Sequence, residues 1–335
     1  MKQYQKSLLR AIVFFICIFI AAILLFFQKQ YTHPLPQLYL EDICTDSGFE
    51  KYIAYDICEL SDGNPWKEQW HLTRLPVYYN TNYDNQSASY DEKMDIMAEK
   101  IKQLQTKIEQ FGITGTIKTV YDTEKGRLES DTMTFFIESH TDQIKVVFHT
   151  PIALSASEKP KAREEAEKLL LELIDTYKEK FHWQECAPAL FSSYSHDGII
   201  QFELWAYEQG DTLEEDLLNY HFHKAWFEID ENANITSILW TNQNLNEKIG
   251  NYPIISPQKA KELLLAKSYM TTSPYSFSED MPIVKTELTY IHHCNSRIFM
   301  PYYKFFVQLP AKENGMNVYG TYYVPAIKEQ YFKKF

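Results

Sequence analysis

An uninterrupted apolar run near the start of the chain, Ala11–Phe27, constrains the fold more than any other feature of the sequence. The run contains no charged residue, glycine or proline. As an α-helix rising ~1.5 Å per residue it would be ~26 Å long, close to the thickness of a bilayer core. We therefore expect a transmembrane helix here, with the rest of the chain folding as a separate body.

The charges beside the run predict its orientation. Lys2, Lys6 and Arg10 precede it, and Lys29 alone follows closely. Because cytoplasmic flanks carry the excess of lysine and arginine, we expect a cell-membrane protein with a cytoplasmic N-terminus and its bulk outside the cell. A cleaved signal peptide or a lipidated cysteine is the alternative. No small residue follows the run at a cleavage position, which favours an uncleaved anchor.

Small residues within the run indicate how the anchor would meet another membrane helix. Small side chains let two helices approach closely in a bilayer. Cys17, which lies in mid-run behind bulky residues, Ala21 and Ala22 supply them. The predicted anchor residues are Ala11, Phe14, Cys17, Ala21, Ala22 and Phe27.

The charge of the chain excludes one class of partner. The formal net charge is −12, and residues 1–27 hold three basic side chains and no acid, so the remainder carries −15. Nucleic-acid binding needs basic patches, so we expect no nucleic-acid partner.

Four cysteines follow the anchor, and an oxidising compartment permits disulfides. Cys44 and Cys58 are the candidate pair because they are close in sequence within a segment that has few other ordering signals. Buried free thiols are the alternative.

Helix and strand patterns alternate along the external part. Ser89 and Glu92 form a capping box ahead of apolar residues spaced three and four apart. A second helix is expected from about 160 to 181, and Ser256 with Pro257 opens a third. Alternating runs after each helix predict antiparallel strands. The expected fold class is α+β: an N-terminal transmembrane helix followed by tandem units of one helix packed on a curled antiparallel sheet.

This pattern predicts a division into segments with separate roles. They are a cytoplasmic tail (1–10), the anchor (11–27), a juxtamembrane stalk with a first strand (28–86), and three α+β units (87–155, 156–250 and 251–335), the last two forming one lobe.

The second and third units resemble PepSY-type extracytoplasmic domains. The similarity lies in the capped run Ile255–Leu264 and in the hairpin from Trp226 to Ile238. Where those domains usually have glycine at the hairpin turn, this chain has Asn232 and Asn234, which tolerate left-handed backbone. With a single anchor and the run Tyr322–Ile327, the chain resembles the YycH/YycI group. That resemblance implies a membrane-anchored regulator of a cell-envelope sensor histidine kinase, with no catalytic residues.

Several residues invite a chemical interpretation, although no catalytic motif is present. His221 and His223 are expected to alternate on one strand, Asn219–Asp230, and could join a nearby His292-His293-Cys294 cluster as zinc ligands. Surface or half-buried histidines are the simpler alternative, and we predict no metal site and no cofactor.

Two other residues are considered for catalysis. Cys186 has His182 four residues before it, but a nucleophile also needs a base that is held in position by a third group. Glu203 is a lone acid on a strand.

Three functions remain open from the sequence. We expect a non-enzymatic membrane-anchored regulator or sensor that binds a partner protein, such as a sensor kinase or another single-span protein. The alternative is a binding module for wall glycan or a small ligand, in which exposed aromatic side chains stack on sugars. An envelope hydrolase acting through Cys186 or Glu203 is the least favoured. The tryptophans available for stacking are Trp66, Trp70, Trp183, Trp205, Trp226 and Trp240.

Overall fold

The computed structural model describes residues 34–40, 63–70, 72–113, 115–194, 200–271, 273–291, 296–313 and 315–333. The predicted anchor and its six residues lie outside these ranges, as do Cys44 and Cys58. Among the helices of the described ranges, none is long and apolar enough to cross a membrane.

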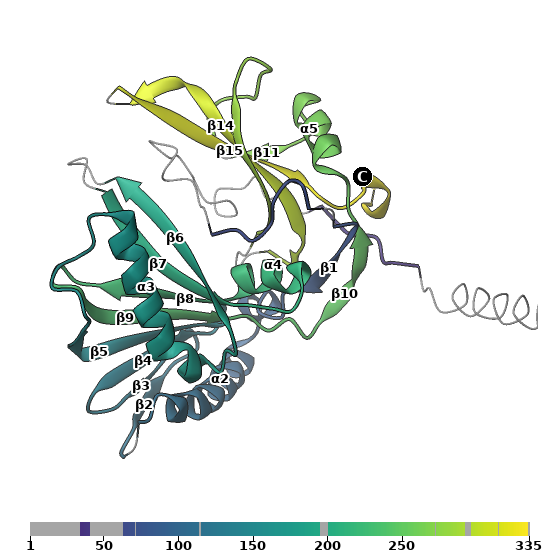
Figure 1. Cartoon of the computed structure of the whole chain (residues 1–335). Coiled ribbons are helices and arrows are strands. Elements are labelled where there is room, and N and C mark those ends of the chain that lie inside the picture. The colour runs from purple at the N-terminus through teal and green to yellow at the C-terminus, as the bar shows by residue number, and fades with distance from the viewer. Residues whose placement is uncertain are drawn as a thin grey trace, which may run out of the picture.

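An antiparallel sheet of eight strands forms the larger lobe, in the order β2-β3-β4-β5-β9-β8-β7-β6 (Figure 1). Strands β2 to β5 follow one another in the chain, and so do β6 to β9. The pairing of β5 with β9 joins the two groups, with Gln143 opposite Thr241 and Val147 opposite Ser237. The strands are β2 (Lys118–Tyr121), β3 (Lys125–Glu129), β4 (Met133–Glu138), β5 (Gln143–Ala153), β6 (Cys186–Tyr194), β7 (Ile200–Glu208), β8 (His223–Ile229) and β9 (Asn234–Asn242).

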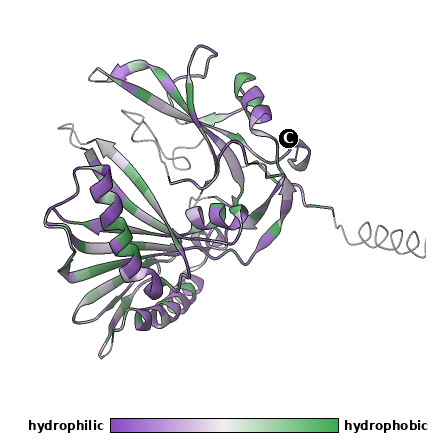
Figure 2. Cartoon of the chain, viewed as in Figure 1, coloured by the Kyte–Doolittle hydropathy of each residue, from purple (hydrophilic) through white to green (hydrophobic). Residues whose placement is uncertain are grey.

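Two long helices cover one face of this sheet, α2 (Tyr90–Gln110) and α3 (Arg163–Tyr177). The predicted capping box begins α2, where Ser89 N donates to Glu92 Oε2 at 2.8 Å and Glu92 N donates to Ser89 Oγ at 3.4 Å. The 3₁₀ turn η3 (Lys178–Phe181) extends α3. Hydrophobic and hydrophilic residues recur along both helices in Figure 2, and their apolar sides form one core with the sheet.

The smaller lobe is built from two further sheets around a second core. A four-stranded sheet has the order β11-β15-β14-β12, and a three-stranded sheet has the order β10-β1-β13. As predicted, Ser256 caps α5 (Pro257–Leu265), its hydroxyl accepting from Lys259 N. The strands are β1 (Arg74–Tyr79), β10 (Lys248–Pro253), β11 (Met270–Thr271), β12 (Ile283–Tyr290), β13 (Ile298–Phe299), β14 (Pro301–Glu313) and β15 (Met316–Pro325), and the remaining 3₁₀ turns are η2 (Asp84–Gln86) and η4 (Glu329–Tyr331).

The predicted fold class is wrong. Strand residues make up 41% of the structure and helical residues 25%, in three sheets rather than in repeated units of one helix and one sheet. Strands expected in separate units join one sheet because β5 pairs with β9, and β1 pairs with β10 and β13 from far along the chain. Alternation along a strand sets which side chains face the core, but it does not select the neighbouring strand.

One predicted strand is partly a helix. The segment expected as strand Asn219–Asp230 begins inside α4 (Leu213–Phe222), and only β8 is extended. Thr212 and Glu215 form a capping box, with Glu215 N donating to Thr212 Oγ1 at 3.2 Å. This Thr-x-x-Glu signal lies in an acidic stretch shortly before the segment that was predicted as a strand.

Candidate functional site

The histidines considered as zinc ligands do not share a strand face. His221 is in α4, buried, with Nε2 3.2 Å from Thr289 Oγ1. His223 begins β8, where its ring nitrogens lie 2.9 Å from Asn219 Oδ1 and 3.2 Å from the Gln243 carbonyl oxygen. Burial lowers the pKa of His223. In the described ranges no group of three or more His, Cys, Asp or Glu side chains is placed to hold a metal ion, and residues 292–294 lie outside those ranges.

The other chemical candidates have ordinary surroundings. Cys186 begins β6, and burial raises the pKa of its thiol to about 11, so the thiol is protonated at neutral pH. A nucleophilic cysteine needs the opposite shift. His182 occupies a left-handed turn after η3, with φ 60°. The Glu203 carboxylate accepts a 3.0 Å hydrogen bond from the indole N–H of Trp205.

The face of the eight-stranded sheet opposite α2 and α3, here called the open face, carries a continuous cross-strand row of side chains. Directly paired residues of antiparallel strands point to the same side of the sheet. The row reads, from β2 to β6, Val120, Arg127, Phe136, Lys145, Leu239, Trp226, Trp205 and Ala189.

Two tryptophans form the centre of the β7–β8 part of this row. The rings of Trp205 and Trp226 have centroids 5.6 Å apart and planes only 11° from parallel, and both side chains are half-buried. The Lys224 ammonium lies 4.6 Å from the Trp205 ring centroid, and Phe191 meets that ring edge-on at 6.1 Å. At the β6–β7 end of the face, Tyr220 of α4 packs edge-on against Tyr207 of β7 and buries Ala189, so α4 covers this end of the row.

Charged groups of both signs surround the aromatic pair. Lys145 Nζ lies 3.1 Å from a Glu228 carboxylate oxygen, and the Ser237 hydroxyl donates to the same carboxylate. Further along the row, Val120 and Phe136 are 45% and 40% exposed. The open face therefore has a half-buried aromatic centre, ion pairs beside it and exposed apolar side chains at its β2–β4 end, which are the features of a recognition surface.

The remaining tryptophans divide between core and surface. Trp66, Trp183 and Trp240 are buried in the two cores, and Trp70 is 44% exposed but lies outside the sheets. The alternation of apolar and polar residues along β7 and β8 indicates which tryptophans face away from the helices. It does not indicate that Trp205 and Trp226 are directly opposite, because that depends on register.

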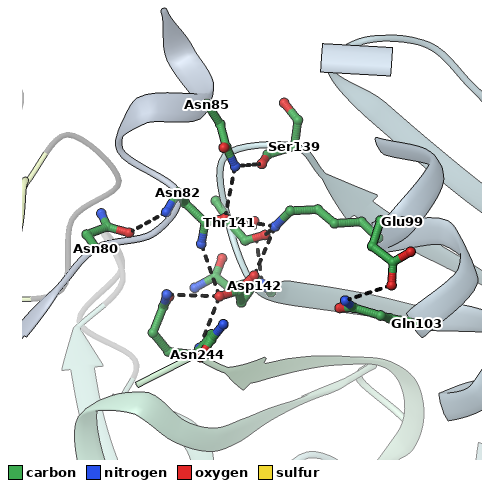
Figure 3. A network of polar contacts seen from close by, with 12 residues as sticks. Asn80, Asn82, Asn85, Glu99, Gln103, Ser139, Thr141, Asp142 and Asn244 are labelled. Carbon is green, nitrogen blue, oxygen red and sulfur yellow. Dashed lines mark hydrogen bonds and ion pairs between the residues drawn. The ribbon is translucent and has the colours of Figure 1, made fainter. Parts of the chain in front are cut away.

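A polar cluster next to the sheet connects the two lobes, and Figure 3 shows it converging on Asp142. This carboxylate follows β4 and accepts from Lys100 of α2 at 2.9 Å and Asn82 Nδ2 at 3.0 Å. It also accepts from Gln243 Nε2 at 2.9 Å and Asn244 N at 3.1 Å. The cluster thus fixes the segment after β1 against the helix and the end of β9. No motif in the sequence marks it.

Comparison with known proteins adds no assignment: the chain matches no family model and no curated protein.

Proposed function

We propose that this chain is a non-catalytic regulatory protein, held at the outer side of a membrane by the apolar segment 11–27, that acts by binding a partner membrane protein through its open face. The observation that carries the proposal is the Trp205–Trp226 pair, half-buried among charges on a sheet face that α2 and α3 leave uncovered. Tryptophan is enriched among the residues that contribute most to protein–protein affinity.

The geometry of the pair favours a protein partner over a glycan. A sugar ring stacks on an aromatic ring whose face is accessible. In this pair one indole faces the other, and the Lys224 ammonium also lies over Trp205. A protein surface can instead pack against indole edges and pair with Lys145 or Glu228 at the rim.

The sequence supports the membrane location and the class of partner. The basic residues before the apolar segment favour an external body. The resemblance of the hairpin from Trp226 to Ile238 to PepSY-type domains favours a sensor kinase as the partner.

In-membrane crosslinking of the full chain, with mass spectrometry of the products, tests the proposal. We expect one single-span membrane protein as the dominant product, and Trp226→Ala to reduce that product at least about tenfold, as loss of an interface anchor worth ~2 kcal/mol would. Trp70→Ala is the matched control because Trp70 is exposed outside the open face. Phe136→Ser is a second test variant, at a position of the open face where the side chain is 40% exposed.

Either of two results would overturn the assignment. Crosslinking that is unchanged in both Trp226→Ala and Phe136→Ser would remove the open face from partner binding. Recovery of wall fragments in place of a protein would favour the glycan-binding alternative.

A further inference from the structure

The described residues nearest in sequence to the apolar segment form an isolated parallel β-bridge with the other end of the described chain, directly after η4. Leu38 N donates to the Tyr331 carbonyl at 2.8 Å, and Lys333 N donates to the Leu38 carbonyl at 2.9 Å. Residues 34–40 and 328–333, with the neighbouring Arg74, are here called the base. Figure 1 shows the base at the opposite end of the molecule from α3 and β2.

The base is fixed to the smaller lobe. Leu38 is buried in the core of that lobe. Tyr252 donates a 2.8 Å hydrogen bond to the Pro36 carbonyl and meets Tyr331 edge-on at 5.5 Å. Lys328 N donates to the Pro253 carbonyl at 3.2 Å. Any contact that the base makes therefore orients the smaller lobe as a whole.

The charged side chains of the base are mostly cationic, and an aromatic side chain is exposed beside them. Tyr39 is 50% exposed, and the Lys333 ammonium lies 4.0 Å from its ring centroid. Lys328 and Arg74 are also exposed, and Glu329 is the acid between the two lysines. Tyrosine and lysine are the side chains that favour a membrane–water interface, because each carries an apolar body and a polar tip. This excess of cations stands out on a body whose net charge is −15.

The chain length places the base close to a bilayer whenever residues 11–27 span one. Six residues, 28–33, separate Phe27 from Pro34. Even fully extended, the seven Cα–Cα steps from Phe27 to Pro34 reach about 24 Å at ~3.4 Å per step. A short tether turns surface contact into an intramolecular event at high effective concentration, so contacts too weak to recruit a free protein can hold a tethered one.

We propose that the base docks on the headgroups of anionic lipids and so holds the body in one orientation on the membrane. The cations of the base meet the negative surface, and Tyr39 reaches the headgroup layer. The rest of the acidic body stands away from the same surface. This proposal rests on the membrane location given above, but it does not depend on which partner the open face binds.

Lysine acetylation of the full chain in nanodiscs, read residue by residue with mass spectrometry, tests the docking. One set of discs contains phosphatidylcholine and the other adds phosphatidylglycerol. Lys102 and Lys168, exposed on α2 and α3, are internal references. We expect labelling of Lys328 and Lys333, relative to the references, to be at least about fivefold slower on the anionic discs, the effect of ~1 kcal/mol per cation at a charged surface. About 1 M salt should remove the difference, because it shortens the Debye length to about 3 Å.

Two charge-reversal variants, one in the base and one outside it, distinguish docking of the base from mere closeness of the body to the membrane. Lys328→Glu should restore the labelling of Lys333 on anionic discs, and Lys168→Glu should leave it slow. Equal labelling of the base on both lipid compositions would overturn the proposal while the protein stays in the discs. A chain that does not enter nanodiscs at all would instead overturn the membrane location.

Discussion

The ammonium of Lys100 lies 2.9 Å from Asp142 Oδ1, and the two side chains are only 10% and 20% exposed. Lys100 also donates to Asn82 Oδ1 at 3.0 Å and to the Thr141 carbonyl at 2.6 Å. A partly buried ion pair with its remaining hydrogen bonds satisfied fixes geometry more than it adds net stability, and removing one member leaves an uncompensated charge. Here the geometry fixed is that of the segment after β1 against the eight-stranded sheet.

Replacing Asp142 should destabilise the protein strongly. Asp142→Asn keeps the shape of the side chain but leaves the Lys100 ammonium without a counter-charge. The new amide NH₂ is itself a donor, and it would face N–H donors that now bond to the carboxylate. We expect the free energy of unfolding to fall by about 3 kcal/mol, measured by urea denaturation. Lys102→Met is the control, because Lys102 and Glu99 are an exposed pair 3.7 Å apart and should contribute less than about 0.5 kcal/mol. Equal losses in the two variants would contradict the role of the cluster.

The Asp142 carboxylate should also make the free energy of unfolding depend on pH in the acid range. Burial acts to raise the pKa of Asp142, but the charge and hydrogen bond of Lys100, with those from Asn244 and Asn82, outweigh it and lower the pKa below its ordinary value. As pH falls below that ordinary value, the unfolded chain takes up the proton before the folded chain does, so the free energy of unfolding decreases. The stabilisation by Asp142 is fully present above the pKa that this carboxyl has in the unfolded chain. It is lost as pH falls through the lower pKa that the carboxyl has in the folded protein.

Urea denaturation at a series of pH values from neutral pH down through the acid range checks this dependence. Other carboxylates titrate in both proteins, so the comparison between the parent and Asp142→Asn isolates one group. The difference in stability should be largest near neutral pH and should narrow toward acid. A difference that stays constant with pH would mean that folding leaves the pKa of Asp142 at its ordinary value.

Local signals in the sequence predict the elements well because their causes are local. Ser89 with Glu92 and Ser256 with Pro257 cap helices within one turn of themselves. Thr212 begins a similar signal for α4, but the strand pattern predicted over Asn219–Asp230 overlaps the end of that helix.

The hairpin turn after β8 shows how a neighbour can override residue preference. Asn232 and Asn234 tolerate left-handed backbone, but Ala233 between them is the residue that adopts it, with φ 54°. The Asp230 carboxylate accepts from the backbone N–H of both asparagines, at 2.9 and 2.8 Å, and so fixes the turn around the residue between them.

The arrangement of the elements depends on contacts far apart in the chain. The pairing of β5 with β9, the register that sets Trp205 against Trp226 and the approach of Asp142 to Lys100 all follow from tertiary packing. No spacing rule encodes them, so the single eight-stranded sheet and the cluster could not be predicted. The tryptophans of the open face could be named as candidates, but not as a pair.

The end of α5 provides a test in which two glycine substitutions have opposite effects. Lys267 follows the helix with φ 61°, and its N–H donates to the Leu264 carbonyl at 3.0 Å while Ser268 N donates to the Leu263 carbonyl at 2.9 Å. A left-handed residue costs less energy when it has no Cβ. Lys267→Gly should therefore raise the free energy of unfolding by about 0.5–1 kcal/mol. Lys261→Gly, at an exposed position within the same helix, should lower it by about 1 kcal/mol. Thermal unfolding of the two variants measures both signs, and a loss of stability in Lys267→Gly would mean that the lysine side chain contributes more than the strained backbone costs.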